Sequence, residues 1–156
     1  MYKELSEDSR RVMQLANQEA QRFEQDYIST GHLLLGILRV NGNIGYQVLV
    51  ERGFDLKVGR QALDEIEPTG NVMVTMGKLN KTAESKESLD YAKKVSFYYY
   101  SPLILPEEIF LGILNETNSV CNMMLGSRGL DKSQLELAVI KRKLINPYDS
   151  FSFTCV

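Results

Sequence analysis

Hydrophobic positions in the chain recur at steps of three and four residues, which is the spacing of helices that bury one face. After polar and acidic residues at 6–8, the first apolar stripe runs through Val12, Met13, Ala16, Ala20 and Phe23. The next helix, which follows Thr30, is apolar around nearly its whole circumference, so we expect it to be the buried one; its apolar residues are Leu33, Leu34, Leu35, Ile37 and Leu38. Two further helices are predicted, a short one that carries Ile44, Val48 and Leu49, and one capped by Asp55 with Ala62, Leu63 and Ile66 on its buried side.

Short polar residues and glycines mark where these helices begin and end. Ser6, Thr30 and Asp55 are each expected to cap a helix by accepting backbone N–H groups of its first turn. Gly53 suits the end of the third helix, where the backbone turns left-handed. The second half of the chain carries equivalent signals at Thr82, Pro106, Ser119, Gly129 and Asp131.

An internal repeat organises the chain at an offset of 76 residues. Leu-Gly-Ile-Leu at 35–38 recurs at 111–114, and Arg-Gly-x-Asp at 52–55 recurs at 128–131. Between positions 6 and 67, 12 of 62 ungapped pairs are identical, about three times the number expected by chance. The repeat therefore predicts a duplicated helical unit.

The predicted fold class is all-α, with two four-helix repeats packed about a pseudo-twofold axis as one eight-helix domain. One fully apolar helix per repeat is hard to bury in a single small unit, which favours one domain over two. The domain is expected within 1–145, with repeat one at 6–67, a linker at 68–81, repeat two at 82–144, and a C-terminal tail at 146–156. No convincing strand is found.

Composition and charge narrow the class of protein. The chain is 44% hydrophobic and 24% charged, with a formal net charge of −2, so it is neither disordered nor a natural partner of nucleic acid or an anionic membrane. Its longest strongly apolar stretch, 32–38, is far shorter than the roughly 20 residues of a membrane span. Acidic residues stand where a signal peptide would be apolar, so a cytoplasmic location is predicted, with Cys121 and Cys155 as free thiols.

Catalytic motifs are not found. Gly77-Lys78 lacks the remaining residues of a phosphate-binding loop, so no nucleotide site is expected. The single histidine, His32, excludes a two-histidine metal site, and a cysteine–histidine dyad would lack an orienting group. The side chains of the neighbouring residues Glu107 and Glu108 should diverge by about 100° on a helix, so they are not expected to form a general acid/base pair. We therefore predict no enzyme activity, no cofactor and no metal.

Two further features have both a structural and a functional interpretation. The aromatic run at 97–100 points all round a helix, so some rings should be core and others exposed. The structural interpretation, a helix end wedged between the repeats, is favoured over an exposed partner contact. Met73 and Met76 on the linker could form an adaptable apolar contact with a partner, or a partly ordered strap.

These motifs resemble the N-terminal domain of the Clp chaperone ATPases, especially the ClpC, ClpA and ClpB group. The segment at 28–38, Ile-Ser-Thr-Gly-His-Leu-Leu-Leu-Gly-Ile-Leu, is similar to the family signature Thr-Glu-His-Leu-Leu-Leu-Gly-Leu, and 105–114 is a weaker copy. The segments 49–55 and 125–131 resemble the Leu-x-x-x-Gly-Val-Asp element of the family. The resemblance covers roughly residues 3 to 145.

The resemblance implies a binding role without ATPase activity. Domains of this family sit on ring-forming ATPases that unfold proteins for a partner peptidase, and they bind adaptor proteins and unfolded or marked substrates. The chain is therefore expected to be a non-catalytic recognition domain of a Clp chaperone-protease or an accessory subunit to one. The tail lacks a Gly/Glu-rich linker, which favours a free-standing protein over an excised domain. A small cytosolic enzyme and a purely structural helical protein that dimerises remain the alternatives.

The resemblance also implies candidate site residues at the starts of the two central helices. In the ClpC branch the glutamate of each signature helps to bind phosphoarginine. Thr30 and His32 keep the signature in the first copy, but Gly31 replaces the glutamate. In the second copy Pro106 replaces the threonine, Glu107 keeps the carboxylate and Glu108 replaces the histidine. We therefore expect phosphoarginine binding to be weak or lost, while the surrounding surface still serves a protein partner.

Overall fold

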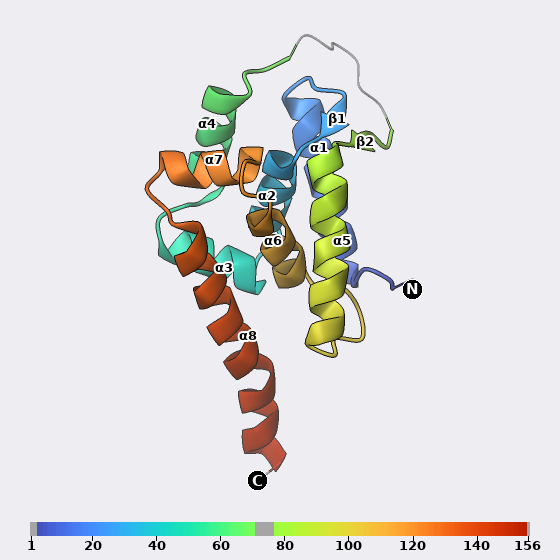
Figure 1. Ribbon diagram of the computed structural model, residues 1–156, viewed down its shortest axis with the longest axis vertical. Helices are drawn as coiled ribbons and strands as arrows, with labels where there is room; N and C mark the ends of the chain where they lie inside the picture. The colour runs from blue at the N-terminus through green and yellow to red at the C-terminus, as the bar shows by residue number, and fades with distance from the viewer. Residues whose placement is uncertain (1–2, 71–76, 156) are drawn as a thin grey trace.

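The computed structural model describes residues 3–70 and 77–155, with side chains as far as residue 145 (Figure 1). Within these residues there are eight helices and one two-stranded parallel sheet. The all-α prediction is confirmed. In chain order the helices are α1 (Glu7–Arg22), α2 (Thr30–Leu38), α3 (Ile44–Glu51), α4 (Leu56–Ile66), α5 (Ala83–Tyr98), α6 (Pro106–Asn115), α7 (Val120–Ser127) and α8 (Lys132–Cys155).

The two central helices, α2 and α6, form the middle of the core. Every residue of α2 is buried, as is every residue of α6 except its last. α1 packs mainly on α2, α5 packs mainly on α6, and the two central helices contact each other. Leu35 and its counterpart Leu111 are both buried, as the repeat predicts. The apolar circumference of α2 therefore reflects contacts on all its sides.

Most helix starts follow the predicted caps. The side chains of Ser6, Asp55, Thr82 and Ser119 each accept the expected backbone N–H bond. Thr30 is the exception, because Ser29 caps α2 and Thr30 is the first helical residue. The Thr30 hydroxyl instead accepts a 3.0 Å hydrogen bond from the backbone of Cys121.

Short extended segments of the two repeats pair with each other. β1 (Tyr27–Ile28) pairs in parallel with β2 (Asn80–Lys81), and Leu5 forms the equivalent bridge with Ile104. The prediction of no strand is therefore wrong, because pairs of two residues are too short to show an alternating pattern. In each pair, the residues that precede the first helix of one repeat join the other repeat. These pairings tie the repeats together.

Matching side-chain bonds and backbone angles repeat the same symmetry. The Ser9 hydroxyl donates to the carbonyl of Ile104 at 2.7 Å, and the Ser85 hydroxyl donates to the carbonyl of Ile28 at 2.9 Å. Glu24 and Tyr100, which are 76 positions apart, have φ angles of 53° and 55°. Non-glycine residues rarely adopt such angles, so their recurrence reflects a duplicated backbone.

The last helix, α8, extends beyond the rest of the structure (Figure 1). Its first half buries Leu135 and Val139 and contacts α3, α6 and α7. Residues 146–155, expected as a tail, continue the same helix. A helix that has already formed needs no further nucleation to extend, although Pro147 cannot donate the backbone bond that other added residues contribute.

Candidate functional site

Each repeat has a surface hollow at the N-terminus of its central helix. The hollow at α6 has a volume of about 400 Å³ and includes Asp8, Pro106 and Glu107. The hollow at α2 has a volume of about 200 Å³ and includes Thr30 and Glu84. Seven of the nine residues that line each hollow correspond through the offset of 76, so the hollows are symmetry-related versions of one site. The structure thus places Thr30 and Pro106 at equivalent positions in the two hollows, and Glu107 in the α6 hollow alone.

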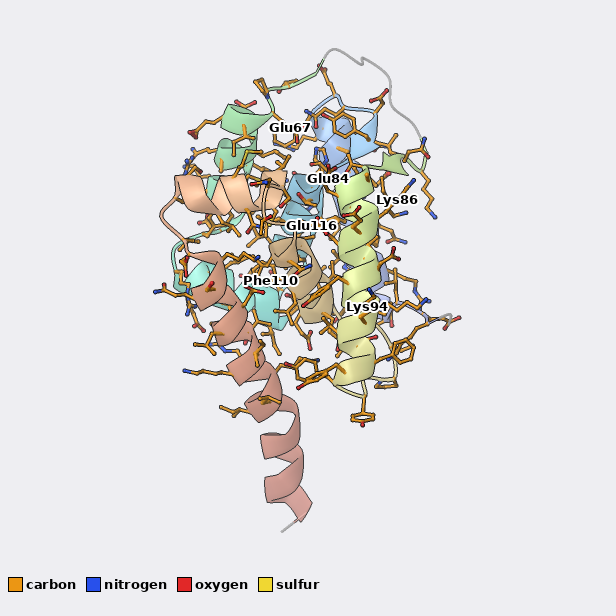
Figure 2. The ribbon with its side chains drawn as sticks, in the orientation of Figure 1. Glu67, Glu84, Lys86, Lys94, Phe110 and Glu116 are labelled. Carbon is orange, nitrogen blue, oxygen red and sulfur yellow. The ribbon has the colours of Figure 1, made fainter. Side chains whose placement is uncertain are left out.

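Two carboxylates line the α2 hollow: Glu67 directly follows α4, and Glu84 lies in the first turn of α5 (Figure 2). The Tyr27 hydroxyl donates a 2.6 Å hydrogen bond to Glu67. This bond, together with burial and the carboxylate charge, raises the pKa of Tyr27 to about 12. The hollow therefore favours positively charged groups over a phosphoryl group.

Gly31 cannot supply the missing carboxylate to this hollow. A Cβ atom at position 31 would lie 2.9 Å from side-chain atoms of Leu63 and Val120, and 3.0 Å from the sulfur of Met124. The position therefore faces the packing between α2, α4 and α7. A glutamate would require the side chains of Leu63, Val120 and Met124 to shift.

Glu107 and Glu108 converge on one buried lysine. Lys143 Nζ lies 3.1 Å from an oxygen of each carboxylate, and all three side chains are at most 8% exposed. Burial opposes the charge of Lys143, but the two carboxylates outweigh it and raise its pKa. The expectation that the two carboxylates diverge is therefore wrong, because both long side chains bend toward a cation on α8. A charged ligand at Glu107 would have to compete with this internal ammonium.

Glu108 has additional structural partners. One of its oxygens accepts from the backbone N–H of Leu105 at 2.8 Å, and the other accepts from the Ser101 hydroxyl. These bonds fix the start of α6 in place of a polar N-cap side chain. The sequence analysis missed Lys143, although it continues the buried stripe of Leu135 and Val139 at steps of four.

His32 is a structural residue in the core. Its Nδ1 accepts a 3.0 Å bond from the backbone N–H of Ser29, and its ring packs near Phe23 and Tyr27. Within the described residues its buried Nε2 has no hydrogen-bond partner. Burial lowers the pKa of His32 to about 4, although the charge of Glu19 opposes this shift. The ring is therefore neutral at pH 7 and does not reach the surface.

The lowered pKa of His32 predicts acid destabilisation. Between pH 6.5 and 4 the unfolded chain binds a proton on this histidine that the folded chain does not, so stability falls as the pH drops through this range. The loss should reach about 3 kcal/mol near pH 4. Urea titrations at several pH values should show a shallower fall for His32→Gln, whose side-chain oxygen can still accept from Ser29. Equal pH dependence of the two proteins would contradict the prediction.

The part of the chain that the structure describes shows neither an activated cysteine nor a cluster of metal ligands. Cys121 is fully buried, and burial raises the pKa of its thiol, so it is not an activated nucleophile. No group of three or more His, Cys, Asp or Glu side chains is placed to hold a metal ion among residues 3–70 and 77–145. Over the same described parts, no helix is long and apolar enough to cross a membrane.

The aromatic run lies on the surface. Tyr98 is 76% exposed and Tyr100 is 90% exposed, Phe97 is also exposed, and Tyr99 is half-buried. The preferred interpretation, a helix end wedged between the repeats, is therefore wrong. The run forms an exposed aromatic patch at the C-terminal end of α5. Met73 and Met76 lie outside the described residues.

Comparison with known sequences identifies the family. The pattern of the Clp repeat (R) N-terminal domain matches residues 4–139. The chain belongs to this family. It is 26% identical over 141 residues to a probable ATP-dependent Clp protease ATP-binding subunit of Chlamydia pneumoniae, and 30% identical over 145 residues to the chloroplastic chaperone protein ClpC2 of Oryza sativa subsp. japonica. Each match covers 90% of this Clp N-domain but only 17% and 15% of the relative.

Solved structures confirm the fold. The N-terminal domain of ClpD from Arabidopsis thaliana superposes with a TM-score of 0.73 at 22% identity, covering 88% of this Clp N-domain and 96% of the other chain. The N-terminal domain of Hsp104 from Candida albicans gives a TM-score of 0.70 at 9% identity, covering 90% and 91%. The predicted resemblance and the double-repeat fold are both confirmed.

Proposed function

We propose that this Clp N-domain recognises adaptor proteins or unfolded and marked substrates for an ATP-dependent Clp chaperone-protease. It does so without catalysis of its own, either as part of a Clp ATPase or as an accessory subunit in the cytoplasm. The observation that carries the proposal is the family match over residues 4–139, with relatives named as ATP-binding subunits of Clp protease. The described residues hold no catalytic constellation that would favour an enzyme.

The exposed aromatic patch supports a partner-binding role. Large aromatic side chains are enriched at the centres of protein interfaces, where they bury much area at a small cost in conformational entropy. Tyr98 and Tyr100 both project into solvent, and Tyr98 packs edge-on against Tyr99 with ring centroids 5.0 Å apart. The patch therefore offers preformed contact area on the second repeat.

Affinity capture with quantitative mass spectrometry tests this function. The tagged chain, expressed in its source cells, should enrich a Clp ATPase, its peptidase or an adaptor over a tag-only control. Tyr98→Ser/Tyr100→Ser alters only exposed rings, so it should fold normally but capture less of the same partner. A chain that enriches no Clp component, or that turns over generic substrates without ATP, would contradict the proposal.

Phosphoarginine binding should be weak or absent in this domain. At the α2 hollow Gly31 supplies no carboxylate, and at the α6 hollow Lys143 already neutralises Glu107. A guanidinium would have to displace a buried ammonium, and Glu108 adds negative charge near the phosphoryl group. We therefore expect no saturable chemical-shift changes in an NMR titration with free phosphoarginine.

Unphosphorylated arginine and Glu107→Gln are the controls for this titration. Saturable shifts at low micromolar phosphoarginine around both Gly31 and Glu107 would contradict the prediction. Shifts confined to the neighbourhood of Glu107, and lost in Glu107→Gln, would show that the second hollow alone retains the site.

A further inference from the structure

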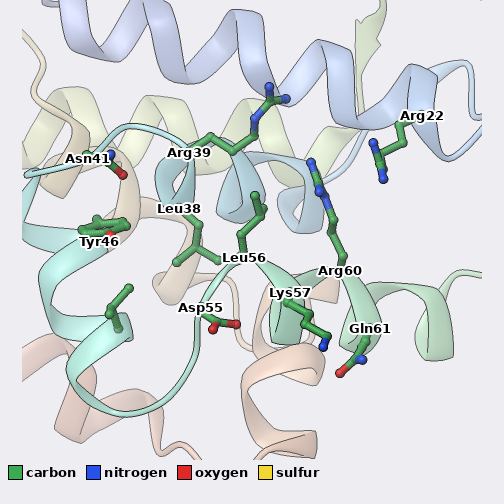
Figure 3. Close-up of a pocket in the computed structure, with 11 residues that line it drawn as sticks. Arg22, Leu38, Arg39, Asn41, Tyr46, Asp55, Leu56, Lys57, Arg60 and Gln61 are labelled. Atoms are coloured by element: carbon green, nitrogen blue, oxygen red, sulfur yellow. The ribbon is translucent and has the colours of Figure 1, made fainter.

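A second kind of surface feature, a basic groove, lies on the first repeat. Its volume is about 870 Å³, and it runs between the end of α2, α3 and the first turns of α4, with α1 along one side. Leu38 and Leu56 form the apolar middle of the groove, and Arg39 and Arg60 point from there toward α1 (Figure 3).

Positive charge dominates the groove. Its lining includes four basic side chains, Arg22, Arg39, Lys57 and Arg60, and one carboxylate, Asp55. The Asp55 carboxylate caps the start of α4, where it accepts a 2.9 Å hydrogen bond from the backbone N–H of Val58. The groove therefore presents net positive charge around an apolar floor.

A buried glutamate holds two of the guanidinium groups in place. Glu19, which is 1% exposed, accepts from Arg39 at 2.9 Å and from Arg60 at 3.0 and 2.8 Å. The single carboxylate of Glu19 thus fixes the positions of two guanidinium groups. Both arginine side chains keep more than a quarter of their surface exposed, and neither makes a further hydrogen bond within the described residues. Their outer N–H groups can therefore meet an incoming anion without a large loss of side-chain entropy.

The second repeat shows that the fold does not require this chemistry. The counterparts of Glu19, Arg39 and Arg60, 76 positions later, are Val95, Asn115 and Glu136. Arg22 corresponds to Tyr98 in the aromatic patch. The same helix junction is thus built without any of the three arginines, so the basic groove is a property of repeat one alone.

We propose that this groove binds an acidic segment of a partner protein. The apolar side chains of the segment would pack on Leu38 and Leu56, and its carboxylates would pair with Arg22, Arg39 and Arg60. The inference deepens the proposed function and rests on it. Guanidinium groups pair bidentately with carboxylates, and an apolar floor between them favours a segment that alternates acidic and apolar residues. A free phosphate ion fits less well, because the carboxylate of Asp55 already occupies the N-terminus of α4 and would repel it.

Fluorescence anisotropy with the full chain tests the groove. The probe is a fluorescein-labelled peptide of alternating acidic residues and leucines, and its matched control carries Asn and Gln in place of Asp and Glu. We expect saturable binding of the acidic peptide only, weakening as salt is raised. Arg22→Glu/Lys57→Glu should lower the affinity about tenfold or more. Both side chains are exposed and make no ion pair within the described residues, so this variant should fold normally.

Lys86→Glu/Lys94→Glu is the charge-matched control. Both lysines lie on α5, away from the groove, and their reversal changes the net charge equally (Figure 2). This variant should bind the peptide as the unaltered chain does. Equal loss in the two variants, equal binding of the neutral peptide, or displacement by inorganic phosphate at matched ionic strength would overturn the proposal.

Affinity capture separates failure of the groove from failure of the proposed function. If the unaltered chain captures Clp components but does not bind the acidic peptide, the groove assignment fails and the recognition function stands. If it captures none, the recognition function itself fails. Capture that is reduced in Arg22→Glu/Lys57→Glu but not in Lys86→Glu/Lys94→Glu would support both.

Discussion

Alanine at both central-helix glycines, Gly36 and Gly112, should destabilise the domain by about 2–6 kcal/mol, a large part of the stability of a typical small domain. A Cβ atom at position 36 would lie 2.5 Å from the backbone oxygen of Val12, and one at position 112 would overlap the backbone oxygen of Ser88. The obstacle in both cases is the backbone of a packed helix rather than a flexible side chain. α1 would have to move away from α2, and α5 from α6.

Gly126→Ala is the matched control for this prediction. Gly126 lies in α7, and a Cβ atom there would meet no atom within 4 Å. Because alanine has the higher helix propensity and a less flexible unfolded state, this change should stabilise the domain by up to about 1 kcal/mol. Urea denaturation followed by circular dichroism gives both values. A Gly36→Ala/Gly112→Ala protein as stable as Gly126→Ala would contradict the packing described above.

The fold could be predicted because its signals are local or repeated. Helical periodicity marked the amphipathic helices, short polar residues marked most of their starts, and the ungapped offset showed that one architecture occurs twice. Gly36 and Gly112 stood out as a repeated pair, but only the structure shows that each admits a neighbouring helix to close contact. The two-residue strands were missed, since pairing across the repeats leaves no pattern in so short a segment.

The site could be predicted less well, because it depends on contacts between charged residues that lie far apart in the sequence. Thr30, Pro106 and Glu107 line the two hollows, and their role in binding a partner stays a prediction. Their electrostatic environment depends on Lys143, which lies 36 positions from Glu107 along the chain. The basic groove likewise depends on Glu19 meeting Arg60, 41 positions away. In both cases the sequence offers one clue, a charged residue on the buried face of a helix (Lys143 or Glu19). The spacing of residues alone does not identify the group with which that charge pairs.

Lys143→Met should destabilise the domain by about 3–5 kcal/mol at pH 7, because it leaves two carboxylates buried without a cation. Both carboxylates are at most 8% exposed, so water cannot readily replace the lost ammonium. Lys141→Met, an exposed change two residues earlier on the same helix, should alter stability by no more than about 0.5 kcal/mol. Urea denaturation of the three proteins at pH 7 measures the difference.

The pH dependence and a rescue variant identify the cause of this loss. Without the lysine, the loss of stability should become smaller as the pH falls, because burying a neutral carboxyl group costs less than burying an unpaired carboxylate. In the unaltered protein the raised pKa of Lys143 means that the ion cluster stabilises the fold below the ordinary lysine pKa and stops doing so at strongly alkaline pH. Lys143→Met/Glu107→Gln/Glu108→Gln should recover most of the loss, since glutamine at 108 can still accept from Leu105. A loss that is independent of pH and is not rescued would show that Lys143 stabilises α8 through packing alone.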